Sequence, residues 1–181
     1  MGKLSLLVAA GAFALQATAC NLIYSASHTF YGWPDNDPAS AQTAYDCGRN
    51  YTAGGSGTFD DPLTFASAPG EFDPCEVIYS PYVMKYLRME DTCAQCTTDW
   101  NGGNGGFPHI DVWVGNSYGG GGDDQVSCEV ELTPQAQSQG LVRYPWDGHT
   151  VNSGELYDLD SVTCYPGNLN TGYSIDDYAN C

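Results

Sequence analysis

The chain has 181 residues, and its 22 aspartates and glutamates outnumber its five lysines and arginines, which gives a formal net charge of −17 at pH 7. A chain this acidic repels nucleic-acid phosphates and anionic lipid surfaces, so we expect neither nucleic acid nor membrane as a partner. Neutral or cationic polymers fit this charge better, although the charge also serves to keep an exported protein in solution.

Residues 1–19 have the pattern of a secretory signal peptide. Lys3 precedes an apolar run that ends at Leu15, and Ala17-Thr18-Ala19 supplies the small residues of a cleavage site. The run is shorter than the roughly 20 apolar residues that cross a bilayer. We therefore expect an extracellular, secreted protein with a mature domain at residues 20–181. A bacterial lipoprotein signal is the alternative, although such signals usually have leucine where this chain has Ala17.

Cleavage after residue 19 leaves eight cysteines, an even number that can form four disulfide bonds in an oxidising compartment. They are Cys20, Cys47, Cys75, Cys93, Cys96, Cys128, Cys164 and Cys181. We expect Cys164 and Cys181 to hold the C-terminal segment. Asn50 begins the sequon Asn50-Tyr51-Thr52, which would carry an N-linked glycan in a eukaryotic secretory pathway.

Short segments that alternate apolar and polar residues between Gly and Pro turns predict β-strands. In chain order, we expect strands at residues 25–32, 58–67, 76–79, 82–89, 109–115, 125–132 and 141–144. One helical turn is expected at residues 40–45. Pro62 cannot donate to a strand ladder, so its strand is expected at an edge or turn. Residues 82–89 are partly apolar on both faces, which predicts a central strand.

Short strands, many aromatic residues and few helix-forming stretches predict an all-β fold that closes into a barrel. We expect a single domain, because the chain has no internal repeat and no linker. Its barrel core is expected at about residues 25–132, followed by an irregular C-terminal extension at residues 133–181.

Aspartates recur where strands are expected to end, at Asp60 or Asp61, at Asp91 and at Asp111. Two carboxyl groups across a cleft can divide acid–base work, because a protonated one donates to a leaving oxygen while an ionised one activates water. Inverting glycosidases separate such groups by about 6.5–9.5 Å. These aspartates therefore predict a candidate site for sugar hydrolysis.

Asp111 shares one face of its expected strand with His109 and Trp113. A tryptophan beside a carboxyl group offers a stacking platform for a sugar ring, and it raises the pKa of the acid by excluding water. The structural alternative is that Trp113 packs in the core while Asp111 accepts backbone hydrogen bonds. Composition alone favours that alternative.

Cys93 and Cys96 have the spacing of a redox or zinc pair. No second pair completes a zinc site, so a structural disulfide is favoured. A copper site would need His28 as the first residue of the mature chain. Cleavage just before His28 would remove Cys20 and leave seven cysteines. Phosphate-binding loops and the Gly-x-Ser-x-Gly motif do not occur in the sequence. We therefore expect no cofactor and no metal.

Four short motifs occur in an order that resembles the three-aspartate domain of bacterial lytic transglycosylases. They are Thr29-Phe30-Tyr31-Gly32, Asp61-Pro62, Glu90-Asp91-Thr92 and Ile110-Asp111-Val112-Trp113. The same order resembles, more loosely, the double-psi β-barrels of expansins and family 45 endoglucanases. The resemblance covers residues 27–115.

The resemblance implies a six-stranded double-psi β-barrel with a polysaccharide groove. It implies that Asp111 is the catalytic acid and that Asp91 and Asp61 support it. The family 45 comparison implies an early aspartate as base, and Asp46 is the counterpart here. The expected substrate-binding residues are Tyr31, Asp61, His109 and Trp113. The chain departs from the transglycosylases in lacking their large wall-binding domain.

The sequence thus predicts a secreted, monomeric glycoside hydrolase or lytic transglycosylase that acts on a cell-wall polysaccharide, such as a glucan or peptidoglycan. Expansin relatives bind glycans on such a barrel without cleaving them. A non-catalytic wall-binding or wall-loosening protein is therefore the alternative. A secreted effector or inhibitor that binds another protein would leave no pattern in this sequence.

Overall fold

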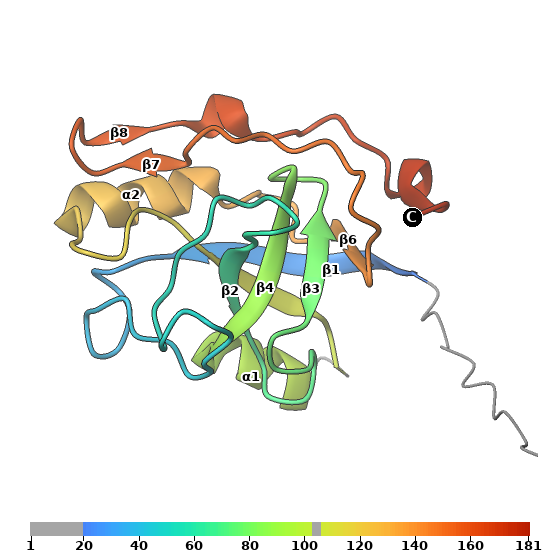
Figure 1. The fold of residues 1–181 in the computed structure, drawn as a ribbon, viewed down its shortest axis with the longest axis horizontal. Coiled ribbons are helices and arrows are strands. Elements are labelled where there is room, and N and C mark those ends of the chain that lie inside the picture. The colour runs from blue at the N-terminus through green and yellow to red at the C-terminus, as the bar shows by residue number, and fades with distance from the viewer. Residues whose placement is uncertain (1–19, 103–105) are drawn as a thin grey trace, which may run out of the picture.

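A closed β-barrel of six strands forms the centre of the computed structural model, which describes residues 20–102 and 106–181 (Figure 1). Around the barrel the strands follow the order β1-β5-β2-β4-β3-β6. Their bounds are β1 Asn21–Tyr31, β2 Leu63–Ser67, β3 Val77–Ser80, β4 Lys85–Thr92, β5 His109–Trp113 and β6 Gln139–Arg143. The predicted all-β closed barrel is confirmed. The expected signal peptide, residues 1–19, lies outside the described residues.

The barrel combines two parallel strand pairs, β1 with β5 and β2 with β4, with antiparallel pairs elsewhere. Strand β2 begins directly after Pro62 and lies between β5 and β4, so it is not an edge strand; Pro62 itself follows the bend at residues 57–61, which agrees with the expected turn. The proline precedes the ladder and therefore does not interrupt it. Because β6 completes the closure, the barrel reaches residue 143, beyond the expected limit near residue 132.

Two helices cover the barrel: α1 Ala94–Asn101 packs against β5, and α2 Gly122–Leu132 packs against β1. The prediction of a strand at residues 125–132 is wrong. The buried residues of α2 follow the helical spacing i, i+3, i+4 and i+7, and they are Gln125, Cys128, Glu129 and Leu132. Two aspartates in the first turn, Asp123 and Asp124, also favour this helix through its dipole.

The C-terminal segment lies over α2 and the barrel (Figure 1). It contains the short strands β7 Tyr157–Asp158 and β8 Thr163–Cys164 and the 3-10 helices η1 Pro166–Asn168 and η2 Ile175–Tyr178. Residues 40–45 form no helical turn; Gln42 makes an isolated bridge with Thr52 there. Among the described helices, none has the length and apolar character that crossing a membrane requires.

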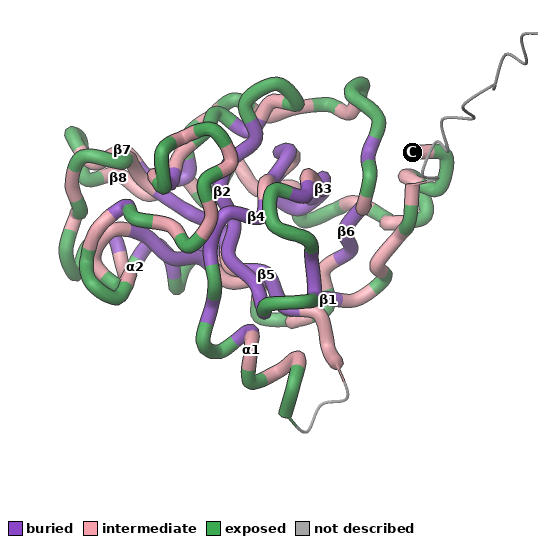
Figure 2. The backbone as a smooth tube through the Cα atoms, turned by 60° about the horizontal axis from the view of Figure 1, so that its bottom comes forward, coloured by how far each residue is buried: buried purple, intermediate pink, exposed green. Residues whose placement is uncertain are grey.

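Burial concentrates in the strands, while the connecting loops and the C-terminal segment remain largely exposed (Figure 2). Strand β4 is buried along most of its length, which agrees with the predicted central strand. The core side chains alternate along each strand with side chains of the opposite face. Large, fully buried members of this core are Phe65, Ile78, Leu87, Met89, Ile110 and Leu141.

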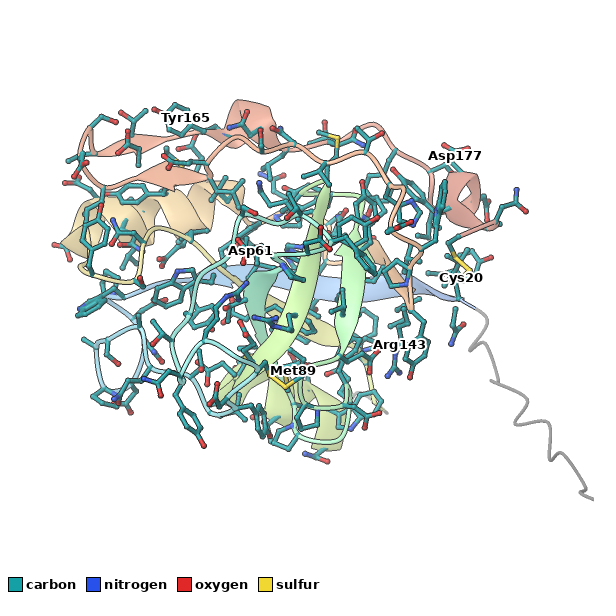
Figure 3. All side chains as sticks on the ribbon, in the orientation of Figure 1. Cys20, Asp61, Met89, Arg143, Tyr165 and Asp177 are labelled. Atoms are coloured by element: carbon teal, nitrogen blue, oxygen red, sulfur yellow. A yellow bond between two sulfur atoms is a disulfide. The ribbon has the colours of Figure 1, made fainter. Side chains whose placement is uncertain are left out.

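All eight predicted cysteines form disulfide bonds, with the pairs Cys20–Cys181, Cys47–Cys75, Cys93–Cys96 and Cys128–Cys164. Cys93 and Cys96 bond to each other, as the structural interpretation of their spacing predicted. The bridges from Cys128 and Cys20 hold the C-terminal segment, also as expected. Figure 3 labels Cys20 on the same side of the molecule as Asp177 of η2.

Candidate functional site

One row of side chains crosses four adjacent strands of the barrel. In register, Thr29 pairs with Asp111, Asp111 with Ala66, and Ala66 with Asp91. The neighbouring row, on the opposite face, is apolar and consists of Phe30, Val112, Phe65 and Met89. Because Asp111 and Asp91 flank the same residue of β2, their Cα atoms are separated by two strand spacings, roughly 10 Å. The predicted convergence of these two aspartates is therefore present.

Asp111 is half-buried, and its Oδ1 accepts a hydrogen bond of 2.7 Å from the Thr29 hydroxyl. Burial, together with the charges of Asp35 and Asp91, raises the pKa of Asp111 to about 7 despite the lowering effect of the Thr29 bond. A carboxyl group with this pKa holds its proton in mildly acidic solution. It therefore has the property of a general acid.

His109 links this carboxyl group to helix α1. Its Nδ1 lies 2.7 Å from Asp99 Oδ2, and its Nε2 lies 3.0 Å from the Thr29 hydroxyl that bonds to Asp111. The side chains of Asp99, His109, Thr29 and Asp111 thus form a continuous hydrogen-bonded chain. His109 is buried, so it orients its neighbours and does not present a surface to a ligand.

Asp91 is buried and held by three donors. Its Oδ1 accepts from the backbone N–H groups of Thr92 at 2.8 Å and Ala44 at 3.0 Å, and its Oδ2 accepts from the Tyr31 hydroxyl at 3.3 Å. Burial raises the pKa of Asp91 even though these bonds lower it. Tyr31 was predicted to bind substrate. Its hydroxyl instead contacts Asp91 and is not free at the surface.

Trp113 is fully buried, and its ring packs edge-on against Tyr31 with a centroid distance of 5.2 Å. The two residues are register partners on β1 and β5, which explains the contact. The expectation that Trp113 is an exposed stacking platform for a sugar is therefore wrong. Its indole nitrogen has no hydrogen-bond partner among the described residues, and the side chain borders a cavity of about 300 Å³.

Asp46 and Asp61 each stabilise a local turn. Asp46 is exposed and accepts from the backbone N–H groups of Gly48 at 3.0 Å and Asn50 at 2.9 Å. Asp61, with a side chain 52% exposed, bonds to Arg49 at 2.5 Å and to the Ser56 N–H at 2.8 Å. The charges that shift the pKa of Asp111 come from Asp35 and Asp91 instead. The catalytic and binding roles expected of these two turn aspartates therefore have no support in the geometry.

Glu129 of α2 is a carboxyl group that the sequence analysis missed. It is buried, and neither of its oxygens has a hydrogen-bond partner among the described residues. Burial and the neighbouring charges of Asp35 and Asp111 together raise its pKa to about 9. A Cβ atom on Gly32, directly after β1, would lie 2.7 Å from its Oε1, so a larger residue there would displace the Glu129 side chain.

Asp35 and Glu129 escaped the sequence analysis for different reasons. Asp35 lies outside the expected strands, and it approaches the site because its Oδ1 accepts from the Gly32 N–H at 2.8 Å. Glu129 was placed on a strand, although the spacing of Gln125, Glu129 and Leu132 also fits one buried helix face. The sequon residue Asn50 is exposed, so its amide is accessible.

Comparison with known proteins gives a match over most of the chain. The family model described as DDB_G0273701 N-terminal domain matches residues 23–165. A Dictyostelium discoideum protein, named Uncharacterized protein DDB_G0273701/DDB_G0273221, is 35% identical over 136 residues, which are 75% of this chain and 57% of that protein. The chain thus spans little more than half the length of this relative. No solved structure gives a significant match.

Proposed function

The chain belongs to the DDB_G0273701 N-terminal domain family, and we propose that its barrel cleaves a polysaccharide with Asp111 as the proton donor. The observation that carries this proposal is the half-buried Asp111 carboxyl group, with a pKa of about 7, at the centre of a row of polar side chains. Such a group can protonate a glycosidic oxygen near neutral pH. The resemblance to the three-aspartate domain supports the same role.

The position of Asp91 supports a two-carboxyl mechanism. Two strand spacings, roughly 10 Å, separate the Cα atoms of Asp91 and Asp111, which is compatible with two carboxyl groups that act on one glycosidic bond. In this mechanism Asp91 activates the water while Asp111 protonates the leaving oxygen. The hydrogen-bonded chain through Thr29 and His109 fixes the orientation of Asp111.

The charge and the disulfide bonds support the substrate and the compartment. A net charge of −17 disfavours polyanionic substrates, so a neutral cell-wall glycan is the favoured class. Four disulfide bonds and no free cysteine among the described residues favour an oxidising, extracellular location. We propose that the protein is secreted and acts there as a monomer.

The test replaces Asp111 by Asn and compares the release of new reducing ends from cellulose, chitin and peptidoglycan. Loss of a general acid should lower the rate by about 10²- to 10⁴-fold. The melting temperature should not fall, because the amide removes a carboxyl group whose burial opposes ionisation. Asp123→Asn, an exposed aspartate of α2, is the matched control. Equal activity of the Asp111→Asn variant and the wild type would exclude this mechanism.

A second candidate function is glycan binding without cleavage. The observation that favours it is the environment of Asp91, because a buried carboxyl group with a raised pKa and three bound donors is a poor base. A pull-down on the same three polymers, followed by reducing-end analysis, separates the two functions. Retention of the wild type on a polymer with no new ends on any of them would favour binding alone.

A further inference from the structure

The hydrogen-bonded chain that ends at Asp111 connects two groups that exchange protons, an imidazole and a carboxyl group. The Nε2 atom of His109 lies 3.0 Å from the Thr29 hydroxyl oxygen, and this oxygen lies 2.7 Å from Asp111 Oδ1. The hydroxyl has no other hydrogen-bond partner among the described residues. Because a hydroxyl carries one proton, it donates to only one of these two neighbours at a time.

Helix α1 fixes the other end of this chain through Asp99. Its Oδ2 lies 2.7 Å from His109 Nδ1, and the Asp99 side chain is 18% exposed. A carboxylate at this distance holds a proton on Nδ1. The Nε2 atom therefore faces Thr29 either as the N–H of an imidazolium or as the bare nitrogen of a neutral ring. The backbone of His109 is held as well, because its N–H donates to Glu71 at 2.9 Å.

The number of protons on His109 Nε2 and the Asp111 carboxyl group decides whether the Thr29 hydroxyl satisfies both contacts. If both groups are protonated, the hydroxyl accepts from each, and its own proton lacks an acceptor. If neither is protonated, two acceptors compete for one hydroxyl proton. If the pair holds one proton, each contact contains one hydrogen and no donor is left over. Because buried polar groups are almost always hydrogen-bonded, the geometry favours this one-proton state.

The single proton has two positions that use the same contacts. When it is on His109, the Nε2–H donates to the Thr29 oxygen, and the Thr29 hydroxyl donates to an ionised Asp111. When it is on Asp111, the carboxyl group donates to the Thr29 oxygen, and the hydroxyl donates to the neutral ring. The two arrangements differ only in the positions of two hydrogens along two hydrogen bonds, so no heavy atom changes its partner.

The charged and titratable groups around the pair act in opposite directions. They are Asp99 on α1, His28 and Tyr31 on β1, Asp35 after β1, Glu71 between β2 and β3, Asp91 on β4 and Glu129 on α2. Asp99 stabilises a positive charge on His109 and so favours the proton on the ring. Burial and the acidic groups near Asp111 raise its pKa and so favour the proton on the carboxyl group. His28 adds no charge near neutral pH, because burial and the charge of His109 lower its pKa to about 3.

We propose that His109 and Asp111 share one proton through the Thr29 hydroxyl, and that His109 returns a proton to Asp111 after each cleavage. The second role rests on the proposed function, but the shared proton does not. Once Asp111 has protonated the leaving oxygen, the N–H bond of His109 Nε2 breaks and its hydrogen passes to the Thr29 oxygen. The former hydroxyl hydrogen of Thr29 passes to Asp111, which leaves a neutral imidazole. After the product leaves, Asp91 releases to the solvent the proton of the attacking water, and the solvent returns one proton to the pair. His109, Thr29 and Asp99 are therefore positioning residues for Asp111.

Nuclear magnetic resonance of isotope-labelled protein tests the shared proton without a substrate. The nitrogen signal of His109 Nε2 and the carboxyl carbon signal of Asp111 should titrate with common midpoints, because each titration step belongs to the pair. Thr29→Val removes the hydroxyl, so the two signals should then have separate midpoints. Thr29→Ser keeps the hydroxyl and should preserve the common ones. A His109 signal that stays constant across the titration of Asp111 in the wild type would overturn the proposal.

Asp99→Asn tests the same link from the other end, and it remains decisive if Thr29→Val fails to fold. Loss of the carboxylate should move the proton toward Asp111 and raise the midpoint of the Asp111 carboxyl signal by about one pH unit. Gln95→Ala is the matched control, because it removes the exposed partner that donates to Asp99 Oδ1 at 3.1 Å and spares the contact with His109. The control should keep the wild-type midpoint. An unchanged midpoint in Asp99→Asn would contradict the shared proton.

The pH dependence of cleavage tests the return of the proton. In Asp99→Asn the alkaline limb of the kcat profile should move upward together with the carboxyl midpoint, whereas a purely structural role would lower kcat equally at every pH. A limb that stays in place would end this second role. Common midpoints in a wild type that cleaves no polymer would end the proposed function and leave the shared proton standing. Cleavage by a wild type whose His109 and Asp111 signals titrate independently would end this proposal alone.

Discussion

Glu76 and Glu90 are buried as deeply as Asp91 and Glu129, but within the described part of the chain only the first two have arginine partners. Two nitrogens of Arg143 bind Glu76, and Arg49 and Arg88 bind Glu90. Among the described residues, Asp91 and Glu129 contact no cation, and burial raises the pKa of each. At equal burial, two of these acids are thus held by arginine ion pairs, while the two without arginine have a raised pKa.

The contrast predicts the largest loss of stability for the arginine-paired acids. Arg143→Met leaves Glu76 buried without its cation, so the free energy of unfolding should fall by about 3–5 kcal/mol. Urea denaturation at pH 7 measures this effect. The double variant Arg143→Met, Glu76→Met should recover much of the loss, because it removes the uncompensated charge. A loss below about 1 kcal/mol in the single variant would show that this pair is not structural.

Glu129 should make the protein less stable as pH rises. Its pKa is raised from 4.5 in the unfolded chain to about 9 in the fold, so the folded state binds an extra proton between these values. Stability therefore falls through this window, and Glu129→Gln should lessen the slope by about 1.4 kcal/mol per pH unit between pH 5 and 7. Denaturation at several pH values measures the slope.

The matched control for this variant is Glu131→Gln, because Glu131 is an exposed glutamate of the same helix. It should leave the slope as it is in the wild type. Asp111, whose pKa is also raised, contributes a separate decline up to about pH 7 in both proteins. Parallel curves for the wild type and Glu129→Gln would refute the buried, protonated state of Glu129.

The smallest effect is expected for Asp61, which has an arginine partner but is exposed. Asp61→Asn should cost less than about 1 kcal/mol, since an exposed ion pair contributes little in water. Polysaccharide cleavage should also continue, because Asp61 stabilises a local turn. Thermal melts and the reducing-end assay measure the two outcomes. A large loss of cleavage would restore the catalytic support that the family resemblance implies for Asp61.

Local patterns predicted most of the barrel strands. The alternation around Phe30, Asp111 and Leu87 is visible in sequence because each strand separates core from polar side chains. The strand predicted at residues 125–132 is a helix. Apolar residues alternate there as in a strand, at Val126, Cys128, Val130 and Leu132, while the residues that are buried have helical spacing. Periodicity alone does not distinguish a strand from a helix in such a short segment.

The site was only partly predictable, because register and turns decide which acids meet. Asp111 and Asp91 lie on either side of Ala66, because both pair with it across three strands. No local sequence pattern predicts this register. Asp46 resembles a catalytic aspartate in sequence, but nearby backbone N–H groups engage it in a turn. Asp35 lies close to Asp111 because the chain folds back at Gly32.

The bridge between Cys20 and Cys181 joins residues 161 positions apart, at the start of β1 and beyond the last 3-10 helix. Tension applied between these two cysteines would load a covalent bond, while the hydrogen bonds of the strands would carry almost none of it. Stretching along that direction should therefore leave the barrel intact under oxidising conditions. Only after reduction would the pull reach β1 and peel it from β6.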